Sequence, residues 1–232
     1  MSVPLTPITL EGRFVRLLPL TNAHVRPLLS AAAGSRESFQ YTWVPEPTTA
    51  DITRYISAAV AAFEAGTAHP FVTVRIDSPD TVVGSTRFMN LEYWLDAPDT
   101  VVGSTRFMNL EYWLDATGHP STRDFPDAVE IGATWLSHDA QRTQVNTEAK
   151  LLMLTYAFET WGVQRVVLRT DARNAKSRAN IERIGAQYEG TLRHHMHSTD
   201  GDNNGLRNTA VYSIIRQEWD AVKAQLQAKL AE

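Results

Sequence analysis

The sequence predicts an α/β (α+β) protein in which helices cover a mixed β-sheet. Strand-like apolar segments alternate with segments of helical periodicity along most of the chain. The segment RVVLRT, residues 165–170, is continuously apolar or β-branched at its centre, which is typical of a buried parallel strand. A chain of 232 residues is long enough for one well-buried core, and its length demands no second domain.

The first part of the chain is predicted to contain two strands and two helices. The first helix takes Thr21 or Asn22 as its N-cap and ends at Gly34. The second ends in glycine after a stripe of apolar residues at helical spacing. The predicted elements are a strand at 14–20, a helix at 21–34, a helix at about 51–65 and a strand at 71–77.

The second part alternates strands and helices more regularly, after a polar surface loop at 117–127. Gly162 ends one helix, and Asn174 and Gly185 bound the next one as its N-cap and its end. The predicted elements are a strand at 129–136, a helix at 146–161, a strand at 165–170, a helix at 174–185, a strand at 209–215 and a helix at 218–231.

The nineteen residues PDTVVGSTRFMNLEYWLDA occur at 79–97 and again, unchanged, at 98–116. Adding one strand to a meander reverses everything downstream, so two strands here would break the parallel pairing of 129–136 with 165–170. We therefore expect one copy in the sheet and the other displaced. The alternative is a self-paired hairpin with Phe88 opposite Phe107, which would project from the sheet and allow a homodimer. The sequence leaves the origin of the duplication open.

Composition excludes several classes of protein. Apolar residues make up 43% and charged residues 21%, as in ordinary globular proteins. A net charge of −4 provides no basic field for nucleic acid, so we expect no nucleic-acid partner. The lack of cysteine excludes disulfides, thiolate metal sites and a cysteine nucleophile. No apolar run approaches the length that spans a bilayer, and we expect a cytoplasmic protein with no membrane partner.

Two long segments resemble a known family. VEIGATWLSHDAQRTQVNTEAKLLMLTYAFE, residues 129–159, resembles motif A of the GNAT superfamily of acyl-CoA-dependent N-acetyltransferases. RVVLRTDARNAKSRANIERIGAQYEGTLR, residues 165–193, resembles the segment that follows it. The likeness is greatest to the Rim-type group, the ribosomal-protein-alanine acetyltransferase-like enzymes. With one copy of the repeat removed, it extends over almost the whole chain.

This resemblance implies the GNAT fold, a mixed and mostly antiparallel sheet with a parallel pair at the cofactor site. It implies a single acyl-CoA N-acyltransferase domain over residues 1–232. It also implies an enzyme that takes acetyl-CoA as acyl donor and acetylates a primary amine, either a protein N-terminus or a small molecule, by direct attack in a ternary complex.

The family binds the pyrophosphate of coenzyme A at a glycine-rich turn before a helix, where backbone N–H groups and the helix dipole favour an anion. The resemblance places this turn at Gln141, Arg142, Thr143, Gln144, Val145 and Asn146. Gln144 stands where the first glycine is expected and Asn146 where the second small residue is expected. We expect Gln144 to add bulk and backbone strain and so to weaken coenzyme binding. Asn146 would tolerate the left-handed region.

Other residues are expected to hold the pantetheine arm and the thioester. The backbone groups of Thr134, Trp135 and Leu136, at a strand end, are expected to pair with the arm. By resemblance, Asn174 hydrogen-bonds the arm and Ser177 lies close to the sulfur. Asn174 would also cap its helix. The tyrosine that often acts as general acid in the superfamily has no clear match, which leaves the proton source for the thiolate open.

The reaction needs a base for the amine, and Glu130 is the candidate, acting directly or through water. The alternative role for Glu130 is a salt bridge on its strand. Tyr41 and Trp43 either line the acceptor site or anchor a loop in the core.

The sequence HHMH at His194, His195 and His197 could place two ring nitrogens on one face of a strand, but no further ligand is evident. We therefore expect a solvated or substrate-facing strand and no metal.

Two other functions stay open. The same fold could use another acyl-CoA such as succinyl-CoA, which a basic residue positioned for the extra carboxylate would favour. A catalytically weak CoA-binding or interaction protein is the second alternative, suggested by Gln144 and by the spare copy of the repeat.

Overall fold

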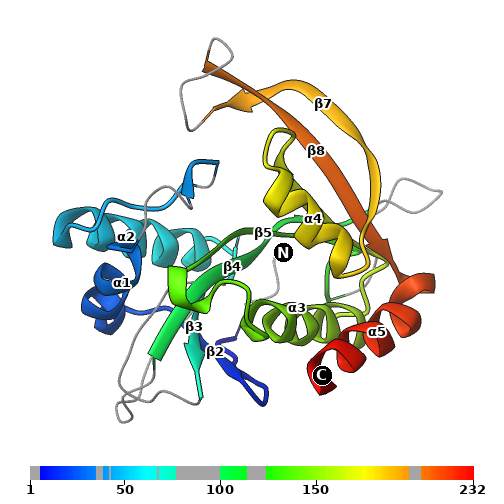
Figure 1. Cartoon of the computed structure of the whole chain (residues 1–232), viewed down its shortest axis with the longest axis horizontal. Coiled ribbons are helices and arrows are strands. Elements are labelled where there is room, and N and C mark those ends of the chain that lie inside the picture. The colour runs from blue at the N-terminus through cyan, green and yellow to red at the C-terminus, as the bar shows by residue number, and fades with distance from the viewer. Residues whose placement is uncertain are drawn as a thin grey trace.

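The computed structural model describes residues 6–34, 39–41, 43–66, 68–76, 100–113, 124–198 and 205–232. Their strands form one eight-stranded sheet in the order β1-β2-β3-β4-β5-β6-β8-β7, with helices packed around it (Figure 1). The strands are β1 (Leu10–Glu11), β2 (Val15–Pro19), β3 (Phe71–Arg75), β4 (Thr100–Glu111), β5 (Ala128–Leu136), β6 (Arg165–Asp171), β7 (Gln187–His197) and β8 (Leu206–Ile215). The α-helices are α1 (Val25–Ala32), α2 (Thr49–Glu64), α3 (Val145–Thr155), α4 (Ala175–Arg183) and α5 (Trp219–Ala231).

The sheet is mixed and mostly antiparallel. Among the described strands, β5 and β6 form a parallel pair, and all other neighbours run antiparallel. This arrangement confirms the predicted fold class, including the parallel pair between 129–136 and 165–170.

A capping side chain marks the start of α2, and a glycine marks the end of the helix that contains α3. The side chain of Thr48 accepts a hydrogen bond from the backbone N–H of Asp51 and caps α2. A π-helical turn, η4 (Tyr156–Thr160), extends α3 up to Gly162, whose φ of 64° ends the helix as predicted. α1 packs against α2, and α3 packs against α5 and β2 (Figure 1).

One copy of the repeat supplies a strand of the sheet. β4 comes from the second copy and lies between β3 and β5. Gly103 of β4 pairs with Thr73 of β3 on one side and with Leu136 of β5 on the other, so both edges of β4 are occupied at this residue. Gly103 therefore has no free edge for pairing with the first copy, and Phe107 lies opposite Ile131 on β5. Phe88 and the rest of the first copy lie outside the described residues.

The strand order predicted from the sequence lacked β1 and β7. β7 is an edge strand that pairs only with β8 among the described strands, and the two form a ribbon that curves past α4 (Figure 1). Almost every residue of β7 is exposed. It therefore has no buried apolar face, which is the pattern that reveals most strands.

Within the described part of the chain, no helix is both long enough and apolar enough to span a membrane.

Candidate functional site

The parallel strands β5 and β6 pair only over the first residues of each strand and then separate. Their ladder pairs Val129 with Val166 and Glu130 with Val167, and it ends there. Beyond this point β5 continues beside β4, while β6 continues beside β8. The edge of β5 that follows Glu130 is thus released from β6, in the segment where Thr134, Trp135 and Leu136 were predicted to bind the pantetheine arm.

A β-bulge lies just beyond the point of separation. Ser104 pairs with Trp135 and Arg106 with Gly132, so two residues of β5, Ala133 and Thr134, lie opposite one residue of β4. Ala133 has φ of 47°, a conformation that non-glycine residues rarely adopt. Such a bulge redirects backbone N–H and C=O groups out of the ladder. Nothing in the sequence marks this bulge, because alanine is not a residue typical of the left-handed region.

The side chain of Thr134 is tied to helix α3. Its Oγ1 accepts a hydrogen bond of 2.6 Å from Nζ of Lys150. Lys150 is buried, and burial lowers its pKa from 10.5 to about 7. The bulge is therefore held to α3 by a hydrogen bond from the Lys150 amine, which loses its charge near neutral pH.

The neighbouring residues of β5 are also held in place. Trp135 is buried and packs edge-on against Phe39, with ring centroids 5.9 Å apart. The carbonyl of Leu136 accepts a hydrogen bond of 3.0 Å from Nε2 of Gln141. The end of β5 is thus linked directly to the predicted pyrophosphate turn.

The turn before α3 has a different conformation from the expected one. Gln144 has φ of −70° and is the N-cap of α3, so the predicted backbone strain at Gln144 is wrong. The left-handed residue is Arg142, with φ of 62°. Thr143 stabilises the turn, because its Oγ1 donates to the carbonyl of Ala140 at 2.8 Å and accepts from the N–H of Val145 at 3.3 Å.

Asn146, which would tolerate the left-handed region, lies within the first turn of α3. Its side chain is buried, and its Nδ2 has no hydrogen-bond partner among the described residues. A buried donor without a partner is costly unless a ligand satisfies it. Together with the N–H groups of the first turn of this eleven-residue helix, Asn146 fits an oxygen-rich ligand such as coenzyme A.

The start of α4 lies beside this turn. Nζ of Lys176 donates to Oε1 of Gln141 at 2.5 Å, which joins two segments far apart in the sequence. Asn174 caps α4 as predicted, since its Oδ1 accepts from the N–H of Ser177 at 2.9 Å. The structure therefore brings Asn174 and Ser177 to the same region as the predicted turn.

Glu130 is buried on β5 and already engaged. Its Oε2 accepts 2.8 Å from Nδ2 of Asn109 and 2.5 Å from Nη1 of Arg169. Asn109 reaches it from a second bulge, where Asn109 has φ of 48° and the register of β4 shifts. The salt bridge considered for Glu130 is present. Its Oε1 has no hydrogen-bond partner in the described part of the chain.

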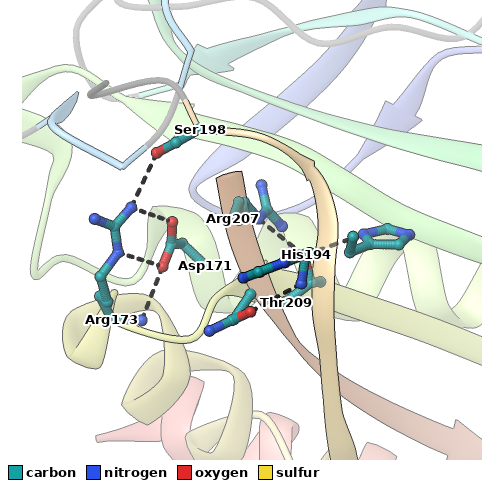
Figure 2. Close-up of polar contacts among 8 residues, drawn as sticks. Asp171, Arg173, His194, Ser198, Arg207 and Thr209 are labelled. Carbon is teal, nitrogen blue, oxygen red and sulfur yellow. Dashed lines mark hydrogen bonds and ion pairs between the residues drawn. The ribbon is translucent and has the colours of Figure 1, made fainter. Parts of the chain in front are cut away.

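A polar cluster surrounds the end of β6 (Figure 2). Arg173 binds both carboxylate oxygens of Asp171, at 3.0 and 2.8 Å, and its Nη2 also donates to Oγ of Ser198 at 3.0 Å. On the adjacent ribbon, Oγ1 of Thr209 accepts from Nε of Arg207 at 3.0 Å. The Nδ1 of His195 lies 3.1 Å from the same oxygen.

The two residues predicted to line the acceptor site, Tyr41 and Trp43, contact different parts of the structure. The guanidinium of Arg173 lies over the ring of Tyr41, 5.2 Å from its centroid, which places Tyr41 at the polar cluster. Trp43 instead packs against Tyr55 of α2, with ring centroids 5.6 Å apart, and is 58% exposed.

The histidines of β7 do not assemble with other ligands. His194 has φ of 45° in a bulge, and its N–H donates to Oδ1 of Asn208 at 2.9 Å. Among the residues that the structure describes, no group of three His, Cys, Asp or Glu side chains is placed to hold a metal ion.

Comparison with known proteins decides the family. The model of the acetyltransferase (GNAT) domain matches residues 15–187, well over half of the chain. The chain belongs to the GNAT acetyltransferase family. This result confirms the resemblance inferred from motif A.

Individual relatives of this GNAT chain agree with that assignment. A 95-residue segment, 40% of the chain, is 35% identical to YdaF of Bacillus subtilis (strain 168), a candidate ribosomal N-acetyltransferase. The match spans about half of YdaF, 49%. A GCN5-related N-acetyltransferase from Brucella melitensis has a TM-score of 0.72 at 24% identity, with 97% of this chain and 86% of that one covered. Mycobacterium smegmatis RimJ has a TM-score of 0.69 at 16% identity, with 96% and 95% covered. The last two likenesses concern the fold.

Several residues of this GNAT site were not predicted. Asn109 lies in a bulge, Arg173 in a loop and Arg207 on the β7–β8 ribbon, none of which the sequence pattern marks. Lys150 had a signal that was overlooked, because it lies one helical turn after Asn146 on the same stripe of α3. The residues missed are Asn109, Lys150, Arg169, Asp171, Arg173 and Arg207.

Proposed function

We propose that the protein transfers an acetyl group from acetyl-CoA to a primary amine by direct attack in a ternary complex. A protein N-terminus is the favoured acceptor, since YdaF is named a candidate ribosomal N-acetyltransferase and RimL, which shares the fold, is named a ribosomal L7/L12 alpha-N-protein acetyltransferase. We further propose that the whole chain acts as one acyltransferase domain.

The observation that carries this proposal is the opening between β5 and β6, with the bulge at Ala133 beside it. The released edge of β5 offers backbone groups to an extended amide-containing arm such as pantetheine. Gln141 joins the end of β5 to the turn before α3, where Nδ2 of Asn146 has no partner among the described residues, and Lys176 joins Gln141 to the start of α4. RimJ of M. smegmatis, which shares the fold, was solved with a CoA disulfide, in support of a coenzyme A site.

Each residue has a proposed task. The turn from Gln141 to Asn146 holds the pyrophosphate, and the backbone of Thr134, Trp135 and Leu136 holds the arm. Acetyl-CoA supplies the activated acyl group as a thioester. Ser177 lies beside the sulfur, and Tyr41 borders the acceptor.

Glu130 takes the proton of the attacking ammonium, directly or through water. Oε2 is committed to Asn109 and Arg169, which fixes the carboxylate, while Oε1 is left to accept the proton. Because Oε2 forms the salt bridge and Oε1 has no partner among the described residues, Glu130 can form the salt bridge and act as the base at the same time.

Calorimetric titration with acetyl-CoA and with coenzyme A tests the donor, followed by acetyl transfer to a panel of amines and peptides. We expect micromolar binding of both ligands and turnover of at least one peptide N-terminus. Folded protein that binds neither ligand would contradict the proposed function. Binding without turnover would favour the catalytically weak binding protein.

Glu130→Gln tests the base. The amide keeps the size of the side chain but cannot take a proton, so kcat should fall by roughly a hundredfold or more, most strongly at low pH where the amine is mainly protonated. The control is Glu189→Gln, which breaks another ion pair of the sheet, between Glu189 of β7 and Arg165 of β6. A pH-rate profile of Glu130→Gln that overlays the wild-type profile removes Glu130 from this role.

A further inference from the structure

Five charged side chains gather where β6 ends and β8 passes beside it. Register places them on one face of the sheet. Glu130 lies opposite Val167, two residues before Arg169, and Asp171 follows two residues later on β6. Asp171 lies opposite Thr209, and Arg207 precedes Thr209 by two residues on β8. Because strand residues two apart share a face, these charges project to the same side as Glu130.

The two carboxylates in this group already have partners. Glu130 pairs with Arg169 at 2.5 Å, and Asp171 pairs with Arg173 at 2.8 Å. Both carboxylates are buried, with side chains 5% and 3% exposed. In each pair the two charges cancel, so the charges of Arg169 and Arg173 are neutralised and that of the third arginine is not.

Arg207 is the third arginine, and it has no carboxylate of its own among the described residues. Its one hydrogen bond there uses Nε, which donates to Thr209 (Figure 2). The two terminal nitrogens, which form the fork that fits a carboxylate, have no partner in that part of the chain. Thr209 is fully buried and fixes the direction of the guanidinium.

The environment of Arg207 also favours an anion. Burial lowers the pKa of Arg207, while the charges of Asp171 and Glu130 act in the opposite direction and that of Arg173 adds to the lowering. A partly buried guanidinium that shares its nearest carboxylates with two other arginines is under-compensated. A ligand carboxylate would supply the missing charge.

We propose that Arg207 binds a carboxylate of the substrate, held beside Glu130. The proposal rests on the acyltransferase function, because it takes Glu130 to lie at the reacting amine. The carboxylate belongs either to the acceptor, as in an acidic peptide N-terminus, or to the acyl group of a dicarboxylic acyl-CoA. Both sources present the same chemistry to Arg207.

Equilibrium binding to the full-length protein separates the two sources. In the acceptor arm, the amidated peptides Ala-Asp-Ala and Ala-Asn-Ala are titrated into protein saturated with coenzyme A. In the donor arm, succinyl-CoA and acetyl-CoA are titrated into free protein. Within each arm the two ligands differ chiefly in the carboxylate, and neither arm requires turnover.

We expect wild-type protein to bind the acidic member of one arm about ten- to a hundredfold more tightly than its neutral partner, as for a hydrogen-bonded charge. Arg207→Gln should abolish that ratio and leave the Kd of the neutral ligand nearly unchanged. Arg193→Gln, which removes an exposed arginine from β7, is the matched control and should keep the ratio.

Wild-type protein that binds acidic and neutral ligands equally in both arms would overturn the carboxylate site, even if Arg207→Gln failed to fold. A ratio that persists in folded Arg207→Gln would also overturn it. In both cases, binding of coenzyme A would leave the acyltransferase function intact. Failure to bind coenzyme A at all would instead contradict the proposed function, and the carboxylate site with it.

Discussion

At the scale of single residues, burial of Lys150 makes the stability of the fold depend on pH. Its amine is buried under the β5 bulge and donates to Thr134. The unfolded chain keeps Lys150 protonated up to about pH 10.5, whereas the folded protein releases that proton near pH 7. Between these values the unfolded state binds more protons, so the free energy of unfolding should rise with pH.

Lys150→Met should remove this dependence. The difference in unfolding free energy between wild type and variant should be flat below about pH 7. Above it, the difference should increase in favour of wild type, approaching about 1.4 kcal/mol per pH unit. Urea unfolding at pH 6, 7, 8 and 9 measures it. Lys229→Met, on the C-terminal helix, controls for the loss of a lysine elsewhere, and a difference that does not change with pH would show that Lys150 stays charged in the fold.

At the scale of elements, α3 anchors the β1–β2 turn through Glu148. Its carboxylate accepts three backbone N–H groups, from Arg13 at 2.6 Å, Phe14 at 2.5 Å and Val15 at 2.7 Å. The carboxylate lies directly against Gly12, where an added Cβ would come within 2.4 Å of its carbon. The helix that carries the proposed coenzyme turn is thus fastened to the first hairpin.

Gly12→Ala should push Glu148 away and leave those backbone groups without their charged acceptor. We expect a loss of about 2–3 kcal/mol in the free energy of unfolding, measured by urea titration. Gly34→Ala is the matched control, because the nearest atom to its added Cβ lies at 3.7 Å, an ordinary contact. Equal stability of the two variants would mean that Glu148 can rearrange without cost.

The sequence predicted these elements well where burial or capping marks them. Strands β2, β3, β5, β6 and β8 follow from their apolar runs, and the ends of α3 and α4 follow from Asn174, Gly162 and Gly185. Of the edge strand β7, only the solvated segment at 194–197 was expected, because nearly all of its residues are exposed and no buried apolar pattern marks the rest. The bulges at Asn109 and Ala133 escaped too, since strand pairing and not local sequence sets them.

The candidate site was predictable in place but not in conformation. The resemblance located the turn before α3 and Asn174, and the structure links that turn to the start of α4 through Gln141 and Lys176. The dihedral angles were misjudged, because the left-handed residue is Arg142 and not Gln144. The arginine cluster depends on contacts between β5, β6 and β8 that no single segment reveals.

At the scale of the whole molecule, the sheet has one position between β3 and β5, and β4 fills it. The parallel pairing of β5 with β6 requires that number of strands. Because the two copies are identical, deleting 79–97 or 98–116 yields the same chain. Either deletion keeps every residue that β4 needs.

We expect the chain shortened by those nineteen residues to fold, with the same affinity for coenzyme A as the full protein. A shorter connection between β3 and β4 lowers the entropy cost of closing it by about 1–2 kcal/mol, so thermal stability should be equal or higher. Differential scanning calorimetry and CoA titration of the two proteins measure this. A shortened chain that does not fold would show that both copies are structural.

Because the sheet has one strand position between β3 and β5 and the chain carries two copies of the strand that fills it, the chain tolerates mutation of one copy in principle. The strand that places Asn109 beside Glu130 is encoded twice in one gene product, and Asn90 is the same residue in the other copy. A point mutation that damages one copy leaves an intact spare within the same polypeptide. We therefore expect the duplication to act as an internal backup, with each copy free to diverge so long as the other still fits between β3 and β5.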